Sequence, residues 1–214
     1  MKSRFIYIIL AIMLVLLLNP YLQTLGLIGK LLSTLILALI PLSCAFALTR
    51  QRKKAIFILL VAAPFVIIDA LNFFFTSHLL LIINLGLGIY LYFYISFLMV
   101  KHLLSIRAVT ADMIYSAVSI YFLIGIGWAG IYDLLEFISP GSFTEQSETD
   151  LLYFSFVTLT TLGFGDVLPL STLAQRLVII EATTGSIYMT VIVAIIVGRY
   201  MSMPDGESEI GLKE

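Results

Sequence analysis

The sequence predicts an all-α membrane protein with six transmembrane helices and a short re-entrant helix between the last two. The first observation is composition: of 214 residues, 61% are hydrophobic and only 12% are charged, with a mean hydropathy of +1.09. Soluble domains are about half apolar and about a quarter charged. A soluble chain this apolar could not cover its surface with polar groups, so we infer that the bilayer is its solvent.

The second observation is a series of apolar segments that approach the roughly 20 residues needed to cross a bilayer. The segments are Phe5–Leu18, Leu25–Leu48, Ala55–Phe75, Leu79–Val100, Met113–Ile138 and Thr172–Tyr200. The first is short, and we expect it to lengthen through Asn19-Pro20 to Leu22 with a kink, or to thin the bilayer locally. Lys2 and Arg4 before an apolar stretch also resemble a signal peptide, but no small-residue cleavage pattern follows. We therefore interpret this segment as a retained span.

The distribution of lysine and arginine predicts the orientation of these spans. With the N-terminus inside and alternating spans, ten of the 12 basic residues fall on the inner side. These are Lys2, Arg4, Arg50, Arg52, Lys53, Lys54, Lys101, Arg107, Arg199 and Lys213. We expect a multi-pass protein of the cell (inner) membrane with both termini in the cytoplasm. The net charge is −1, and the chain has no basic block that would suggest nucleic acid as a partner.

A shorter apolar run, Leu151–Leu159, is too short to cross a membrane. The pattern Ser147-x-x-Asp150 is typical of a helix start, so we predict a helix from Glu148 to Leu159 that enters from the outside. Gly163-Phe164-Gly165 then breaks any helix. Irregular backbone at membrane depth is tolerated only where it is buried in protein or lines a watery path. We therefore predict a segment that dips into the membrane and returns.

The two glycines beside Phe164 can adopt backbone conformations that are forbidden to other residues. This freedom lets successive carbonyl groups point toward one axis, and four copies of the segment would form stacked rings of oxygen. Rings of this kind replace the hydration shell of a potassium ion. The Thr161 hydroxyl can supply the innermost ring, and the short helix would aim its negative C-terminal end at the space below.

The stretch Thr160-Thr161-Leu162-Gly163-Phe164-Gly165-Asp166 resembles the potassium-channel signature, usually Thr-Thr-Val-Gly-Tyr-Gly-Asp. The wider segment, from about Met113 to Tyr200, resembles bacterial potassium channels of the ion-transport-2 pore-domain family. The resemblance implies an outer helix, a pore helix, a selectivity filter and an inner helix. It also implies a homotetramer, because one filter per chain requires four chains to close a pore.

The family's functional roles carry over to matching positions of this chain. The carbonyl ligands of K⁺ would come from four filter residues: Thr161, Leu162, Gly163 and Phe164. Gly165 would complete the outer turn of the ion-binding filter, and Thr160 and Asp166 would support it. Gly185 lies 20 residues after Gly165, where the resemblance places the hinge glycine of the inner helix.

Glu181 lies in the last span, one turn before Gly185, so both residues share a helix face. It could brace the pore helix or place negative potential near the cavity, and the sequence leaves both alternatives open. Thr172-x-x-Gln175 predicts the start of this helix, and Pro204 predicts its end. The expected organisation is a four-helix membrane region (1–107), a pore domain (108–200) and a short cytoplasmic tail (201–214), with no room for a ligand-binding domain.

Three positions depart from the family pattern. Leu162 replaces the commoner valine and Phe164 the commoner tyrosine, so Phe164 has no hydroxyl to tie the filter to its surroundings. Phe154 stands where many relatives place a tryptophan that donates to the filter aspartate. We therefore expect Asp166 to find another donor or to stay hydrated, and the filter to be less firmly braced than in those relatives.

A glycine-rich stretch in the fifth span, Gly125-Ile126-Gly127-Trp128-Ala129-Gly130, formally matches a dinucleotide-binding fingerprint. It lies inside an apolar span with no preceding strand, so that interpretation fails. Small residues in a membrane helix instead favour close packing against neighbouring helices.

These features predict a passive, potassium-selective channel with no enzymatic activity, no cofactor besides the permeating K⁺ and no small-molecule substrate, surrounded by membrane lipids. Strong voltage gating is not expected, because Leu79–Val100 holds no basic residue and each sensor charge gains only about 2.3 kcal/mol per 100 mV. One alternative is a weakly selective cation channel of the same architecture. A potassium transporter subunit would carry four degenerate filter-like loops, and this chain carries one. A membrane scaffold with a silent pore is a third alternative.

Overall fold

Helices make up most of the chain that the computed structural model describes, namely residues 4–23, 25–48, 52–72, 74–75, 77–106, 109–144 and 150–202. In chain order they are α1 (Ile6–Gln23), α2 (Gly26–Ala47), α3 (Arg52–Leu71), α4 (His78–Ser105), α5 (Ala111–Ile138), α6 (Leu151–Leu159) and α7 (Thr172–Met201). Each contains most of one apolar segment of the sequence, and α6 coincides with the short run between the last two spans.

Among the described residues, 5 helices are long and apolar enough to cross a membrane: α2, α3, α4, α5 and α7. The protein is therefore a multi-pass membrane protein. Within α1, Ile6–Leu22 forms a shorter apolar helix. This helix continues through Pro20 to Gln23, which is the lengthening that the sequence predicts. Its membrane crossing, and with it the count of six spans, stays a prediction.

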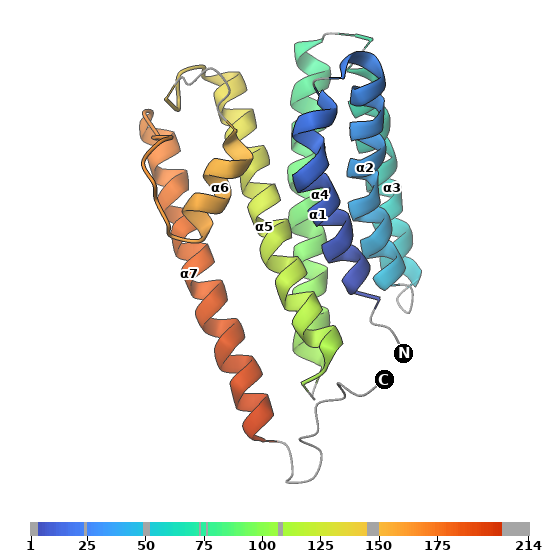
Figure 1. Ribbon diagram of the computed structural model, residues 1–214, viewed down its shortest axis with the longest axis vertical. Helices are drawn as coiled ribbons and strands as arrows, with labels where there is room; N and C mark the ends of the chain where they lie inside the picture. The colour runs from blue at the N-terminus through green and yellow to red at the C-terminus, as the bar shows by residue number, and fades with distance from the viewer. Residues whose placement is uncertain are drawn as a thin grey trace.

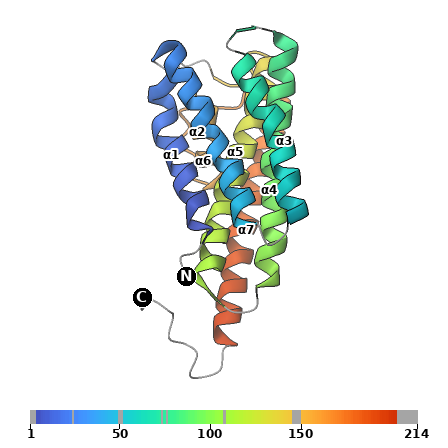
Figure 2. The same ribbon diagram turned by 90° about the vertical axis from the view of Figure 1, so that its right-hand side faces the viewer.

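The long helices are arranged in two groups with α5 between them (Figures 1 and 2). On one side α1–α4 pack side by side, with α1 on α2, α2 on α3, and α3 on α4. On the other side lie α6 and α7, which contact each other and α5. The start of α1 and the end of α7 lie at the same end of the molecule (Figure 1). The short helix α6 thus rests on the rest of the chain mainly through α5 and α7.

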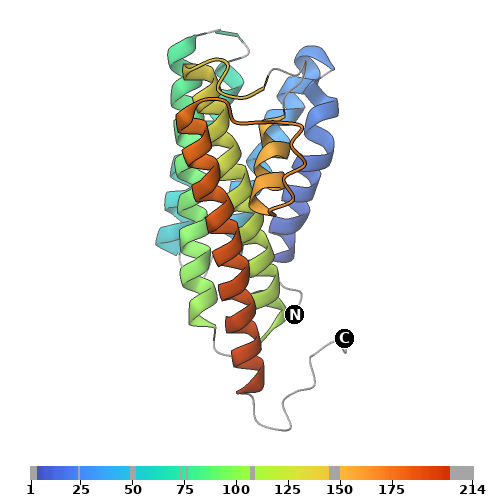
Figure 3. The same ribbon diagram turned by 90° about the vertical axis from the view of Figure 1, so that its left-hand side faces the viewer.

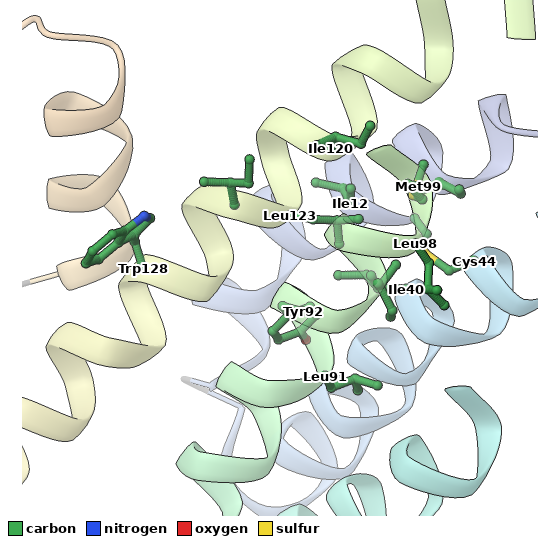
Figure 4. Packing of buried hydrophobic residues seen from close by; sticks show 14 of the residues in the cluster. Ile12, Ile40, Cys44, Leu91, Tyr92, Leu98, Met99, Ile120, Leu123 and Trp128 are labelled. Carbon is green, nitrogen blue, oxygen red and sulfur yellow. The ribbon is translucent and has the colours of Figure 1, made fainter. Parts of the chain in front are cut away.

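The best-packed core lies where α5 meets the bundle of α1–α4 (Figure 4). Ile12, Ile40, Met99 and Ile120 come from four different helices and are fully buried there. In the 18-residue apolar stretch of α5, 50% of the residues are buried. In the corresponding stretch of α7, only 11% are buried. Most of the apolar surface of α7 therefore faces outward from the single chain.

The start of α7 differs by one residue from the predicted start. The side chain of Ser171 accepts a hydrogen bond from the Ala174 amide at 3.2 Å, so Ser171 caps α7 and the predicted cap at Thr172 is wrong. A cap needs a non-helical backbone, and Ser171 is extended while Thr172 is already helical. Asp150 caps α6, and the predicted earlier start at Ser147 and Glu148, like Pro204, lies outside the described residues.

The glycine-rich stretch of α5 packs closely against neighbouring helices, as its small residues predict. A Cβ atom added to Gly125 would lie 2.8 Å from the ring of Phe156 in α6. A Cβ atom on Gly127 would lie 3.0 Å from the ring of Phe93 in α4. Glycine at these positions allows α5 to approach the helices on both of its sides.

The lower end of α7 is joined to the end of α4 by Arg199. Its guanidinium donates from Nη1 to the Leu103 carbonyl and from Nη2 to the Leu104 carbonyl, both at 3.1 Å. The last carbonyls of a helix have no partner within the helix. Arg199 therefore caps α4 and connects the bundle to the last helix of the chain.

Candidate functional site

The site is built on α6, which is held at both ends by polar contacts. At its start, the Asp150 carboxylate accepts hydrogen bonds from the amides of Leu152 at 2.9 Å and Tyr153 at 3.1 Å. At its lower end, the Tyr121 hydroxyl of α5 donates to the Leu159 carbonyl at 3.1 Å. After α6 the chain turns and runs back beside it to the start of α7 (Figure 3). The returning segment contains the residues singled out by the sequence.

The backbone of the returning segment alternates in handedness. The φ angles of Thr161, Gly163 and Gly165 are +59°, +60° and +78°, and the residues between them do not have positive φ. Such an alternation turns successive carbonyl groups toward the same side of the chain. Positive φ is expected at glycine, but it is rare for a β-branched residue such as Thr161. The sequence predicted the two glycine positions, while the conformation of Thr161 carried no sequence signal.

The amides of the returning segment point toward the end of α6. The Thr161 amide donates to the Thr158 carbonyl at 2.9 Å, and the amides of Leu162 and Gly163 donate to the Val157 carbonyl at 3.0 and 3.4 Å. Residues 160–166 are exposed in the single chain. One edge of this segment is therefore fastened to α6, and the opposite edge is open.

Asp166 is supported by Tyr153, whose hydroxyl donates to its Oδ2 at 2.6 Å. This hydrogen bond holds the pKa of the Asp166 carboxyl below its usual value. This contact agrees with the expectation that Asp166 finds a donor other than Phe154. Phe154 is one residue further along the helix and is turned into the interior, where its ring lies 5.3 Å from Tyr132 and 5.2 Å from Phe143. Of the two adjacent aromatic residues, Tyr153 is the one whose side chain reaches Asp166.

The segment that follows Asp166 is bound to the loop after α5. The Thr144 amide donates to the Leu168 carbonyl, and the Leu168 amide donates to Thr144 Oγ1, both at 3.0 Å. The Leu170 amide donates to the Ser142 carbonyl at 2.7 Å. The loop is fixed in turn by Glu136, a residue of α5 that accepts from two loop amides. These contacts hold the outer end of the returning segment, and the sequence analysis did not identify them.

Gly185 lies where α7 comes closest to the end of α6. A Cβ atom at this position would lie only 2.2 Å from the Leu159 carbonyl oxygen. No side chain other than hydrogen fits such a distance without a shift of the backbone. The structure thus gives Gly185 a packing role that the sequence analysis did not consider, and its role as a hinge stays a prediction.

Glu181 is fully buried among α5, α6 and α7. Its Oε2 contacts the Tyr132 hydroxyl of α5, and its Oε1 lies 2.5 Å from Ser155 Oγ of α6. These contacts are those that a brace of the short helix requires. Tyr132 and Ser155 lie 49 and 26 residues away in sequence, which is why no local pattern pointed to them.

The Thr160 side chain is held by a hydrogen bond to its own helix. Its hydroxyl donates to the Phe156 carbonyl at 2.6 Å, within the last turn of α6. All residues predicted for the site thus lie in one region between α6 and α7, with Thr160 to Asp166 along the returning segment and Glu181 and Gly185 behind α6. Residues 160–166 of this region form an exposed edge of the single chain.

The chain resembles known ion channels in sequence. The chain is similar to the inward rectifier potassium channel Kirbac3.1 of Paramagnetospirillum magnetotacticum, with 37% identity over 68 residues, or 32% of this chain and 21% of that protein. The chain therefore spans about a fifth of the length of this relative. No solved structure matches the chain. The family model Ion_trans_2, described as “Ion channel”, matches residues 89–202, more than half of the chain, from the middle of α4 to the end of α7. The chain belongs to this family of ion channels.

Proposed function

We propose that the protein is a passive, potassium-selective channel whose filter is the segment from Thr161 to Gly165. The observation that carries the proposal is the alternating backbone, with positive φ at Thr161, Gly163 and Gly165 in a segment whose open edge faces outward. Carbonyl oxygens aligned in this way can replace the hydration shell of K⁺. The similarity to a protein named a potassium channel supports the same ion.

The ligands of the permeating ion are the carbonyl oxygens of Thr161, Leu162, Gly163 and Phe164, with the Thr161 hydroxyl as the innermost ligand. Gly165 completes the outer turn. Thr160 and Asp166 support the filter from behind, Asp166 through its hydrogen bond with Tyr153. The negative C-terminal end of α6 favours a cation below the filter. The protein needs no cofactor, because conduction involves no covalent step.

The channel is a homotetramer around an axis beside the returning segment. One filter segment per chain requires four copies to surround an ion. The apolar surface of α7 supports assembly, since Ile180, Ile187 and Val191 are all about half exposed in the single chain. In this arrangement α6 is a re-entrant pore helix, α5 is the outer helix and α7 is the inner helix.

The membrane orientation follows from the basic residues. The end at which α1 begins and α7 ends faces the cytoplasm of the cell membrane, and the start of α6 faces outward. The bundle of α1–α4 surrounds the pore domain. Gating is not strongly dependent on voltage, because Leu79–Val100 holds no basic residue that could respond to the field.

The proposal is tested by current through the purified protein in planar bilayers, with potassium on one side and sodium on the other. A reversal potential close to the potassium equilibrium value, together with block by barium, is the expected result. Absence of current from protein that is shown to be tetrameric and folded would contradict it. The control is a double substitution of Gly163 and Gly165 by alanine, which should abolish current because neither position tolerates a side chain at positive φ.

The second candidate function is a weakly selective cation channel. One residue of the filter sequence supports this candidate. Phe164 lacks the hydroxyl of the commoner tyrosine, and its side chain is 66% exposed in the single chain. The same experiment separates the two candidates. A clear current that reverses near zero would support weak selectivity, and a Phe164→Tyr variant should then move the reversal potential toward the potassium value.

A further inference from the structure

Three contacts between oxygen atoms meet around Glu181 and Ser155, between α5, α6 and α7. The Tyr132 hydroxyl contacts Glu181 Oε2. Ser155 Oγ lies 2.5 Å from Glu181 Oε1 and 2.8 Å from the Gly125 carbonyl oxygen. At such distances each contact requires a proton between its two oxygens, because two acceptors without a proton repel each other.

The two hydroxyl groups supply only two of the three protons. Tyr132 and Ser155 each carry one O–H, and the Gly125 carbonyl carries none. The contact with Gly125 therefore uses the Ser155 proton. The remaining contact, between Ser155 Oγ and Glu181 Oε1, needs a proton from the carboxyl group. An ionised Glu181 would leave one of the three contacts without a proton.

The surroundings of Glu181 favour the same protonation state. The side chains of Glu181, Ser155 and Tyr132 are all fully buried. Within the described part of the chain, the polar groups that contact the carboxyl are these two hydroxyls, and neither carries a positive charge. A buried carboxylate without a cation is strongly disfavoured, whereas a carboxylic acid with a hydrogen bond at each oxygen is not.

We propose that Glu181 is a neutral carboxylic acid and a positioning residue for the pore helix. It donates to Ser155 through Oε1 and accepts from Tyr132 through Oε2, while the Ser155 hydroxyl donates a hydrogen bond to the Gly125 carbonyl. This chain of hydrogen bonds joins α7 to α6 and α5 directly behind the filter. Glu181 thus braces the filter support and adds no charge to the wall of the conduction path, which decides between the two roles left open by the sequence.

The inference rests on the proposed function only in naming α6 as the pore helix, and its first test needs no ion flux. The infrared spectrum of the full chain in lipid is compared with that of the Glu181→Gln variant at neutral pH. The expected difference is loss of one carboxylic acid C=O band in the variant. Loss of a carboxylate band instead would overturn the proposal.

A second variant tests the direction of the hydrogen bonds. Ser155→Ala keeps the carboxyl group and Tyr132 but removes the acceptor of the acid proton. The C=O band assigned to Glu181 should then shift to higher frequency. A band that stays in place would show that Ser155 does not accept from Glu181, which contradicts the proposed chain of hydrogen bonds.

Thermal unfolding of the oligomer tests the positioning role. Glu181→Ala should lower the apparent Tm by several degrees, because Tyr132 and Ser155 lose buried partners. Glu181→Gln, which keeps the shape, one donor and one acceptor, should restore most of that loss. If glutamine is as damaging as alanine, the neutral hydrogen-bonding role fails. An acid band in a protein that passes no potassium would refute the proposed function and leave this inference standing.

Discussion

At the residue scale, the Tyr153 hydroxyl supports the outer end of the proposed filter. It is the donor to the Asp166 carboxylate, at 2.6 Å, and it extends from a helix that is itself capped at its start. A hydrogen bond to an ionised acceptor is stronger than one between neutral groups. Because the Asp166 side chain is exposed, the consequence is expected in the stability of the filter rather than in the fold.

Removal of this donor should weaken the filter. Tyr153→Phe removes the hydrogen bond from Tyr153 to Asp166 while the ring is retained, so we expect faster inactivation of potassium current during a sustained recording. The measurement is the ratio of steady to initial current in planar bilayers. Tyr200→Phe, the same chemical change at the far end of α7, is the matched control. Equal ratios in both variants would contradict a supporting role for Tyr153.

The ionisation of Asp166 predicts a pH dependence. Its pKa is lowered by Tyr153, so the stabilising contact is fully present above the ordinary aspartate pKa of about 3.9 and is lost only as pH falls through the lowered value. Outer acidification from pH 7 to pH 5 should therefore leave inactivation unchanged. Inactivation that accelerates across this range in the wild type, and not in Asp166→Asn, would contradict the lowered pKa.

A substitution at Gly185 distinguishes a packing role from a hinge role for this residue. In Gly185→Ala the new methyl group would meet the Leu159 carbonyl at 2.2 Å, so we expect overpacking that destabilises the oligomer by about 1–3 kcal/mol. Gly198→Ala is the control on the same helix, because nothing lies within 4 Å of its added Cβ atom. It should be neutral or slightly stabilising, since alanine favours a helix more than glycine does. Equal thermal stability of the two variants would favour a pure hinge at Gly185.

At the scale of elements, the 9 residues of α6 form a helix too short to be stable alone. It persists because Asp150 caps its start, Tyr121 binds its end, and its buried face packs against α5 and α7. The extended segment beyond it is held at its outer end by backbone contacts with the loop after α5. Helix α6 and the returning segment, the proposed pore helix and filter, are therefore one unit whose geometry depends on neighbouring elements.

The cap of α6 can be tested separately. Asp150→Ala removes the acceptor of two amides and should destabilise the pore helix by about 1 kcal/mol. Asp150→Ser, which can also cap a helix, should recover most of that loss. Thermal unfolding of the purified oligomer is the measurement. A serine variant no more stable than the alanine variant would show that the carboxylate acts in some way other than capping.

At the scale of the whole molecule, the bundle of α1–α4 and the part formed by α5–α7 are joined at two levels. One is the long contact between α4 and α5, with its buried core (Figure 4). The other is Arg199, which binds the end of α4 from the last turn of α7. Any movement of the lower end of α7 must therefore break this link or carry α4 with it.

Loss of the link should loosen both helix ends. In Arg199→Ala we expect faster hydrogen exchange in residues 99–106 and 194–202, because the last carbonyls of α4 lose their cap. Arg199→Lys, which presents one ammonium group in place of a fork, should show an intermediate effect. Arg176→Ala at the other end of α7 is the control. Unchanged exchange in the alanine variant would mean that the two parts of the molecule are not coupled through this residue.

The sequence by itself determined the membrane class, the positions of the apolar helices and the location of the candidate filter. These properties depend on composition, on uninterrupted apolar length and on glycines that break a helix, all of which are local in the chain. Even so, local patterns misplaced the cap of α7 by one residue. They also did not identify Tyr153 as the donor to Asp166, because the face that a side chain takes on a short helix depends on how that helix is packed.

Only the tertiary structure decided which groups surround the filter. Tyr132, Ser155 and Glu181 come from three helices and meet because α6 lies between α5 and α7. The close approach at Gly185 and the positive φ of Thr161 likewise follow from how α6 and the returning segment are held. Contacts between residues distant in the chain are set by helix packing, and packing depends on the shape of all partners together. That is the physical reason why the sequence located the candidate filter, while the structure was needed to identify the residues that contact it.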